Sequence, residues 1–277
     1  MNALFYPLNK LNTEEETESI FTNRGFLFGD GFFESMRYHN GKIQFYDDHF
    51  ERIKRAFHIL KLSTAFLNKE SLLLNLMESL NSFSGDARVR LTFFRVGGGL
   101  YTPDGENAAA LIQTQSWPSN QYELNEKPVS LGIYNESFKS RNIISSIKSL
   151  NALIYVLAGI YARENKFDDV LILNDNENIC EAVSSNFFLV KNRVIYTPPV
   201  SEGCVEGVMR KQVFKFARAS GIKTEEIELN QTDLQNADEV FLTTGTKGFI
   251  TVGNFHQITF KKEIVLTLHE RLMEATS

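Results

Sequence analysis

Apolar side chains recur every three or four positions in five stretches of the chain, the spacing that lines one face of a helix. In the first stretch, Phe50, Ile53 and Phe57 share a face, and Asp47 or Asp48 suits the capping position before it. The pattern predicts helices near residues 48–60, 71–80, 144–160, 208–220 and 262–276.

Shorter stretches alternate between apolar and polar residues or are apolar throughout, as half-buried and fully buried strands do. Strands at 32–38 and 42–45 flank the turn His39-Asn40-Gly41, which predicts a hairpin. The remaining predicted strands are 88–95, 108–114, 129–134, 169–173, 186–191, 193–197 and 238–243. Strands and helices mix through the whole chain, which indicates an α/β or mixed α+β fold.

The segment 115–127 is polar, contains Pro118 and shows neither period. A chain of 277 residues suits two domains. We therefore predict an N-terminal α/β domain at 1–114, an interdomain linker at 115–127 and a C-terminal domain at 128–277.

Composition excludes several classes of protein. The net charge is -5 and Lys and Arg form no cluster, which argues against nucleic acid as the main partner. No apolar run reaches the ~18 residues of a membrane span, and the first residues lack the apolar core of a signal peptide. Two cysteines without metal-type spacing indicate neither a disulfide scaffold nor a metal site. We expect a cytoplasmic protein that binds neither membrane nor metal.

A single lysine, Lys148, stands at the start of the apolar stretch ISSIKSLNALIYVLAGI. Helical spacing predicts that Leu150, Leu153 and Leu157 belong to a buried stripe. A lysine at a helix end can reach solvent with its amine and have no further role. Alternatively, a dry pocket lowers the pKa of the lysine, and the neutral amine becomes a nucleophile for a carbonyl.

Three other features complement such a lysine. Arg52 lies on a helix face with His49, Glu181 lies on a predicted turn in ENICEAVSSNFF, and the motif EGVMR begins a helix at about Val208 and Met209. A solvated helix face, a surface turn and an ordinary helix start are the structural alternatives. Together, an amine, a phosphate-binding helix terminus and a carboxylate are the protein groups that pyridoxal phosphate requires.

These motifs resemble those of class IV pyridoxal-phosphate enzymes of fold type IV, which include branched-chain aminotransferases, D-amino-acid aminotransferases and 4-amino-4-deoxychorismate lyases. FGDGFFESMR with DDHFERI resembles the family's N-terminal signature, IKSLNALIYVLA its lysine motif and EAVSSNFFLV its carboxylate motif. TPPVSEGCVEGVMR resembles the phosphate loop, and DEVFLTTGTKGFITV the final strand that contacts the phosphate. The matches follow the family order over nearly the whole chain.

The resemblance implies a two-domain fold like that of D-amino-acid aminotransferase, with the cofactor bound mainly by residues 128–277. Lys148 corresponds to the lysine that binds the cofactor covalently, and Glu181 to the carboxylate that faces the pyridine nitrogen. Arg52 corresponds to the phosphate-binding arginine. The implied backbone and turn contacts to the phosphate come from Val208, Met209, Thr244, Gly245 and Thr246. A small-molecule amine as substrate and a homodimer are also implied.

Four local features favour the lyase among the family's activities. Ser35 directly follows Glu34, and the lyases resemble this chain in having a hydroxyl residue there, although threonine is the expected one. Leu153 stands five residues after the lysine, where branched-chain enzymes have tyrosine. The loop RVGGGLYTPDG lacks the arginine and histidine pair of D-amino-acid enzymes, and Met209 replaces the threonine that is usual in transaminases.

We therefore predict a lyase that forms 4-aminobenzoate and pyruvate, in the folate precursor pathway, with Lys148 and Ser35 as catalytic residues. Glu34, Arg95 and Tyr101 are candidates for substrate binding, although Glu34 can equally be a structural acceptor and Arg95 a structural arginine. The alternative is a branched-chain or D-amino-acid transaminase that uses 2-oxoglutarate. A catalytically silent family member that binds a metabolite or partner is the remaining possibility.

Overall fold

The structure is a computed structural model that describes residues 2–6, 23–81, 83, 85–117 and 122–277, with only the backbone path for 2–6. It divides into two compact units. Unit 1 comprises Met1–Asn120 and Ile147–Asn151, and unit 2 comprises Gln121–Ser146 and Ala152–Ser277. Residues 118–121 of the predicted linker lie outside the described residues. The domain bounds 1–114 and 128–277 therefore stay a prediction.

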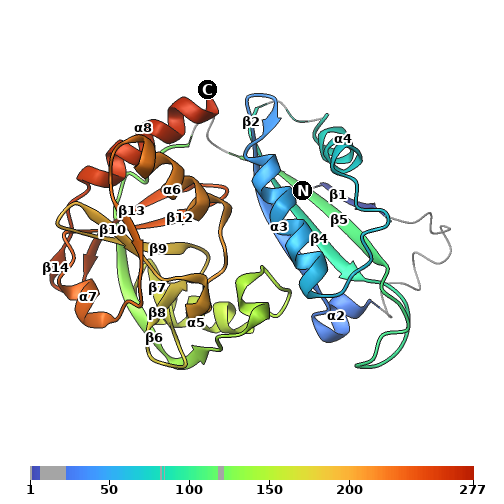
Figure 1. Ribbon diagram of the computed structural model, residues 1–277, viewed down its shortest axis with the longest axis horizontal. Helices are drawn as coiled ribbons and strands as arrows, with labels where there is room; N and C mark the ends of the chain where they lie inside the picture. The colour runs from blue at the N-terminus through green and yellow to red at the C-terminus, as the bar shows by residue number, and fades with distance from the viewer. Residues whose placement is uncertain (1, 7–22, 82, 84, 118–121) are drawn as a thin grey trace. The chain divides into compact units, whose positions relative to one another are not determined.

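Unit 1 is built on an antiparallel sheet with the strand order β1-β5-β4-β2-β3 (Figure 1). The strands are β1 (Asn2–Tyr6), β2 (Gly31–His39), β3 (Lys42–Ile43), β4 (Ala87–Arg95) and β5 (Ala108–Ser116). The hairpin of β2 and β3 is the one that the sequence predicts. The helices are α2 (Arg24–Phe28), α3 (Tyr46–Ile59) and α4 (Lys69–Leu80).

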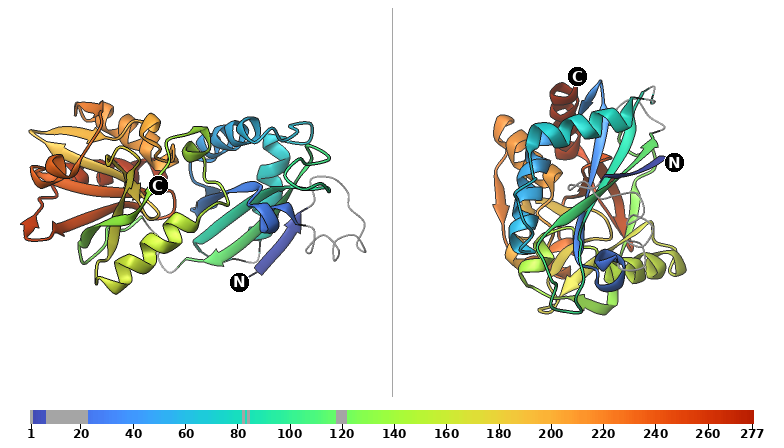
Figure 2. Two further views of the ribbon diagram at one scale, coloured as in Figure 1. Left: turned by 90° about the horizontal axis from the view of Figure 1, so that it is seen from below. Right: turned by 90° about the vertical axis from the view of Figure 1, so that its right-hand side faces the viewer.

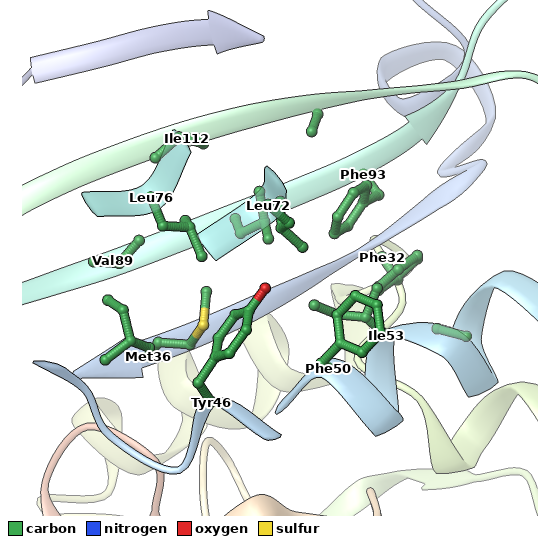
Figure 3. Packing of buried hydrophobic residues seen from close by; sticks show 14 of the residues in the cluster. Phe32, Met36, Tyr46, Phe50, Ile53, Leu72, Leu76, Val89, Phe93 and Ile112 are labelled. Carbon is green, nitrogen blue, oxygen red and sulfur yellow. The ribbon is translucent and has the colours of Figure 1, made fainter. Parts of the chain in front are cut away.

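Helices α3 and α4 lie on the same face of this sheet (Figure 2). Because side chains alternate between faces along a strand, every second residue of β2, β4 and β5 packs against the two helices. Figure 3 shows this core, in which strand and helix side chains interdigitate: Phe32, Met36, Val89, Phe93 and Ile112 from strands, and Tyr46, Phe50, Ile53, Leu72 and Leu76 from helices. We call this the helix-covered face of the sheet.

Strand β3 pairs only with Tyr38 and His39, at the far end of β2. The first half of β2 pairs instead with the segment Ile147–Asn151, through an antiparallel bridge between Phe32 and Ser149. An unpaired strand edge offers N–H and C=O groups to any adjacent segment. The short β3 thus leaves room for the segment that contains the candidate lysine.

Unit 2 contains a larger mixed sheet with the order β11-β10-β9-β12-β13-β6-β7-β8, and β14 pairs with β13. Its strands are β6 (Val129–Lys139), β7 (Asp169–Asn174), β8 (Ile179–Ala182), β9 (Asn186–Lys191), β10 (Val194–Thr197), β11 (Thr224–Glu226), β12 (Glu239–Thr244), β13 (Gly248–Phe255) and β14 (Ile258–Thr259). Its α-helices are α5 (Leu153–Glu164), α6 (Val208–Ala219), α7 (Gln231–Gln235) and α8 (Glu263–Thr276). Helix α5 packs against β6 and β7, and α6 and α8 pack together against β12 and β13.

The long helix predicted at 144–160 is wrong at its start. A 3₁₀ turn occupies Ile143–Ser146, an extended segment follows, and α5 begins only at Leu153. The predicted buried stripe is also wrong, because Leu153 is 77% exposed and Leu157 49% exposed. Small residues make the buried face of α5: Ala158 and Ala162 pack against Tyr134, Val170 and Ile172.

Within the described ranges, no helix is long and apolar enough to span a membrane.

Candidate active site

Lys148 lies in extended backbone beside β2. The Phe33 N–H donates to the Lys148 carbonyl at 2.8 Å, and the Leu150 N–H donates to the Gly31 carbonyl at 3.0 Å. These bonds fix the segment on both sides of the lysine. The Lys148 side chain is half-buried, and its Nζ lies 4.8 Å from the centroid of the Phe33 ring. Pairing with β2, and not a helix terminus, therefore positions this amine.

Glu34 is buried on the helix-covered face of β2, with no exposed surface. Arg52 of α3 donates from Nε to one carboxylate oxygen at 2.7 Å and from Nη2 to the other at 2.6 Å, and His49 Nδ1 lies 2.6 Å from the latter. Burial raises the pKa of Glu34, but Arg52 and His49 outweigh it and lower the pKa to about 2. Burial also lowers the pKa of His49. These contacts favour a structural acceptor at Glu34 over substrate binding.

Ser35 points away from these helices, as the alternation along a strand requires. It is half-buried and lies directly opposite Arg90 of β4 in the antiparallel register. The next residue on its face toward the start of β2 is Phe33. Ser35 therefore shares one side of the sheet with the ring that the Lys148 amine approaches.

Arg95 and Tyr101 border the glycine-rich loop of unit 1. Arg95 is buried and donates to Asp30 at 3.0 Å and to the carbonyls of Leu60, Lys61 and Gly105. These bonds favour the structural alternative for Arg95, because they engage its guanidinium with the protein itself. Tyr101 is 90% exposed, with its ring 5.6 Å from that of Phe28.

Glu181 of unit 2 lies on β8 and not on the predicted turn, and it is only 3% exposed. Its first oxygen accepts from Lys139 Nζ at 2.5 Å and from the Tyr155 hydroxyl at 2.7 Å. Its second oxygen accepts from the Val205 N–H at 2.9 Å. A carboxylate can accept about four hydrogen bonds, so the second oxygen retains the capacity for one further donor.

The sequence prediction missed Lys139 and Tyr155. Burial lowers the pKa of Lys139, but the adjacent carboxylate outweighs it and raises the pKa overall. Burial, and after it Glu181, raises the pKa of Tyr155, so this hydroxyl remains a proton donor. The available signals were a lysine at the end of an otherwise alternating strand and a tyrosine on an apolar helix, and neither indicates a partner.

Helix α6 begins at Val208, three residues beyond the backbone N–H of Val205 that binds Glu181. Gly207 precedes the helix, and no side chain of a described residue caps it. A Cβ at Gly207 would lie 1.8 Å from Oδ1 of Asn186, whose amide donates to the Val205 carbonyl at 2.7 Å. The loop therefore requires glycine. The first N–H groups of α6, at Val208 and Met209, form the type of terminus that binds anions.

Thr244, Gly245 and Thr246 connect β12 and β13 in unit 2. The Thr244 hydroxyl accepts from the Lys247 N–H at 2.9 Å and lies 3.4 Å from the Thr246 hydroxyl. The neighbouring Thr243 hydroxyl is buried without a hydrogen-bond partner among the residues that the structure describes. Hydroxyl groups thus concentrate at this turn, as they do in phosphate-binding loops.

Each unit gathers part of the predicted site. Unit 1 contains Lys148, Ser35 and Arg52, and unit 2 contains Glu181, the start of α6 and the turn at 244–246. In the described part of the chain, no three His, Cys, Asp or Glu side chains could hold a metal ion together.

Comparison with known proteins identifies the family. The family model described as amino-transferase class IV matches residues 31–255. The aminodeoxychorismate lyase of Vibrio harveyi is 26% identical over 244 residues, which cover 87% of this chain and 89% of the lyase. The D-alanine aminotransferase of Bacillus licheniformis is 28% identical over 260 residues, which cover 91% of this chain and 87% of that enzyme.

A solved structure of the Escherichia coli branched-chain amino acid aminotransferase matches the fold with a TM-score of 0.86 at 20% identity, over 100% of this chain and 95% of that one. The α/β fold of type IV predicted from the motifs is therefore confirmed. Enzymes of this family depend on pyridoxal phosphate. The chain belongs to the class IV aminotransferase family and is a pyridoxal-phosphate-dependent enzyme.

Proposed function

We propose that the protein is a 4-amino-4-deoxychorismate lyase, which converts its substrate to 4-aminobenzoate and pyruvate. The relation between Ser35 and Lys148 carries this proposal. Both groups lie on one side of the unit 1 sheet, where the Lys148 amine approaches the Phe33 ring and Ser35 is two residues from Phe33 on β2. A base and a hydroxyl on one surface suit a reaction that removes one proton and delivers another.

The residues of unit 2 fit pyridoxal phosphate in two ways. The second oxygen of Glu181 can accept one more hydrogen bond, which suits a protonated pyridine nitrogen. The uncapped start of α6, at Val208 and Met209, suits a phosphate because of its N–H groups and its dipole. We assign further phosphate contacts to Thr244, Gly245 and Thr246.

In unit 1, we assign the covalent attachment of the cofactor to Lys148 and a phosphate contact to Arg52. Arg52 also binds Glu34 through two nitrogens. This bidentate pair holds the guanidinium plane in one orientation and so prepares it for an anion. When bound, the cofactor withdraws electrons from the substrate carbon that carries the amine.

The chain's own groups then move protons. Lys148 removes the proton from the ring carbon that carries the substrate amine. The bond between the ring and the enolpyruvyl oxygen breaks, and Ser35 donates a proton to the departing enolpyruvyl group. The proton taken from the ring balances the proton that pyruvate receives, and no water is consumed.

The decisive experiment supplies the cofactor-loaded protein with aminodeoxychorismate and follows pyruvate and 4-aminobenzoate. We expect equal amounts of the two products, complete loss in Lys148→Ala and a rate reduced by roughly 10² in Ser35→Ala. Ser35→Thr is the matched control, because it keeps the hydroxyl. Unchanged turnover in Ser35→Ala would remove the serine from the mechanism.

A transaminase is the second candidate, because the D-alanine aminotransferase is about as similar in sequence as the lyase. The same protein is therefore incubated with L- and D-amino acids and 2-oxoglutarate. Keto-acid formation without any 4-aminobenzoate would replace the lyase assignment. Absence of both reactions in protein that binds the cofactor would favour a silent member of the family.

We also propose a cytoplasmic homodimer, which the resemblance to the family supports. Light scattering on the purified protein should give twice the chain mass of 31.6 kDa. A monomer that retains full activity would contradict this assignment.

A further inference from the structure

Lys139, the last residue of β6, is a buried lysine whose side chain is only 8% exposed. Its ammonium donates to Glu181 Oε1 at 2.5 Å and to the Ser145 carbonyl at 3.2 Å. The ammonium also lies 5.2 Å from the centroid of the Tyr155 ring. A buried lysine is costly to the fold unless its charge is compensated. Glu181 supplies this compensation, and the two charges are therefore coupled.

The two oxygens of Glu181 face different groups. Lys139 and the Tyr155 hydroxyl both donate to Oε1, at 2.5 and 2.7 Å. Among the residues that the structure describes, Oε2 accepts only from the Val205 N–H, at 2.9 Å. The oxygen that can accept one further bond is thus the one that Lys139 does not bind. The ammonium contacts the carboxylate directly, whereas the carboxylate separates it from any group bound at Oε2.

The other titratable groups beside this carboxylate are neutral at neutral pH. Burial, and then Glu181, raises the pKa of the Cys204 thiol to about 12. The same two causes raise the pKa of the Cys180 thiol and that of the Tyr155 hydroxyl. Lys139, whose pKa Glu181 raises against the effect of burial, remains charged. Lys139 therefore provides the positive charge beside Glu181.

A carboxylate and a pyridine nitrogen that are hydrogen-bonded to each other compete for one proton. A fixed positive charge disfavours a proton nearby, and this repulsion falls with distance. The Lys139 ammonium, which touches the carboxylate, thus disfavours a proton on Glu181 more than a proton on a nitrogen beyond it. The Tyr155 hydroxyl acts in the same direction, because donors stabilise the ionised carboxylate.

We propose that Lys139 is a positioning residue that keeps the shared proton on the pyridine nitrogen of bound pyridoxal phosphate and off Glu181, with a smaller contribution from Tyr155. This proposal rests on the assignment of Glu181 to the pyridine nitrogen, but not on the choice between lyase and transaminase. A protonated ring withdraws electrons more strongly than a neutral ring does. Lys139 therefore supports the chemistry through Glu181, without contact with the reacting carbon.

A lysine that only stabilises the fold through its ion pair is the alternative. Lys139→Gln separates the two explanations, because glutamine retains a hydrogen-bond donor and removes the charge. Lys139→Arg keeps the charge and should act as the wild type. Lys191→Gln is the matched control, because it removes a lysine that pairs with a carboxylate, Asp238, in a largely exposed position of the same unit.

The test measures the ¹⁵N chemical shift of the ring nitrogen in protein loaded with ¹⁵N-labelled pyridoxal phosphate, without substrate. Free cofactor in acid and in base supplies the reference shifts of the protonated and unprotonated ring. We expect Lys139→Gln to move the shift toward the unprotonated reference, with a change of about 10-fold or more in the ratio of the two forms. Lys139→Arg and Lys191→Gln should keep the wild-type shift.

Tyr155→Phe keeps the ammonium and removes one neutral donor, so it should move the shift in the same direction by less. A melting curve shows that each variant is folded, and Tyr155→Phe provides the test if Lys139→Gln does not fold. An unchanged shift in Lys139→Gln, or in Tyr155→Phe where only that variant folds, would overturn the proposal. So would equal changes in Lys139→Gln and Lys139→Arg, because the charge would then have no effect.

Glu181→Gln tests the underlying assignment separately. If this variant keeps the wild-type shift, Glu181 does not bind the pyridine nitrogen, and the proposal fails together with that assignment. If Glu181→Gln changes the shift and Lys139→Gln does not, only the role of Lys139 fails. The product assays decide between lyase and transaminase independently, because the labelled samples contain no substrate.

Discussion

The two faces of the unit 1 sheet differ in how their charged side chains are paired, although residues of the two faces alternate along the same strands. On the helix-covered face, the buried Glu34 carboxylate is enclosed by Arg52 and His49. On the far face, defined by Phe33, Ser35 and Arg90, the Arg90 guanidinium lies against the Phe33 ring, and no carboxylate among the residues that the structure describes binds it. We call the first arrangement self-neutralised and the second uncompensated.

This difference separates charges that the fold pairs with an opposite charge from a charge that it does not pair. A buried ion pair is stable only while both partners remain, because removal of one leaves the other desolvated. An uncompensated, half-buried cation contributes little to stability, so its removal does little to the fold. The two faces should therefore respond differently to the same substitution.

Arg52→Met should have the largest effect, because it leaves the Glu34 carboxylate fully buried. We expect a loss of about 3–5 kcal/mol in the free energy of unfolding at neutral pH. Arg90→Met, the same substitution on the far face, should cost less than about 1 kcal/mol. Urea unfolding of the cofactor-free proteins measures both. Equal losses would show that the two faces do not differ in this way.

Acid should weaken the helix-covered face in a defined range. The pKa of Glu34 falls from 4.5 to about 2 in the folded protein, so the ionised form stabilises the fold above pH 4.5. This contribution, about 3 kcal/mol, should disappear as the pH falls from 4.5 to about 2. In Glu34→Gln, the free energy of unfolding should lose the part of its pH dependence that Glu34 causes in this pH range. The exposed Glu51 lies on α3, the helix that also carries His49 and Arg52, and provides the control. Glu51→Gln should leave the pH dependence of the free energy of unfolding unchanged.

Unit 2 contains a second self-neutralised pair, Lys139 and Glu181, which sharpens the comparison. Lys139→Met should cost about 2 kcal/mol, less than Arg52→Met, because the Tyr155 hydroxyl and the Val205 N–H still bind the carboxylate. Urea unfolding without cofactor measures this loss. A titration with pyridoxal phosphate should also show weaker binding, since Glu181 would be held less firmly. A loss as large as that in Arg52→Met would mean that the two remaining donors do not compensate.

Periodicity predicted most elements of both units, because the strands of unit 1 alternate and α3 and α6 bury one face. It failed for residues 147–151, where hydrogen bonds to β2 decide the backbone conformation. Those bonds can form because β3 pairs only with Tyr38 and His39 at the end of β2. No local sequence pattern indicates how long that pairing is. Periodicity also failed for the buried face of α5. Ala158 and Ala162 pack against the sheet there, whereas Leu153 and Leu157 are exposed.

The motifs in the sequence point to the candidate site residues more readily than to the side chains around them. Lys148, Glu181 and the start of α6 have sequence signals of their own, because a cofactor restricts residue type and spacing together. Arg90, Lys139 and Tyr155 do not. Their contacts are with residues that are far apart in the sequence, and only the register of β2 against β4 brings Arg90 to Phe33.

The smallest effect on stability should come from Ser35→Ala on the far face. Ser35 is half-buried beside Arg90 and is not part of the Glu34 cluster, so the free energy of unfolding should change by less than about 0.5 kcal/mol. The neighbouring substitution Glu34→Gln, one residue earlier on β2, should cost several times more, because it removes the charge that Arg52 and His49 share. Urea unfolding of the two variants compares adjacent positions of one strand directly. A loss above about 1 kcal/mol in Ser35→Ala would give the far face a structural role and would weaken the case that its polar groups are kept for a ligand.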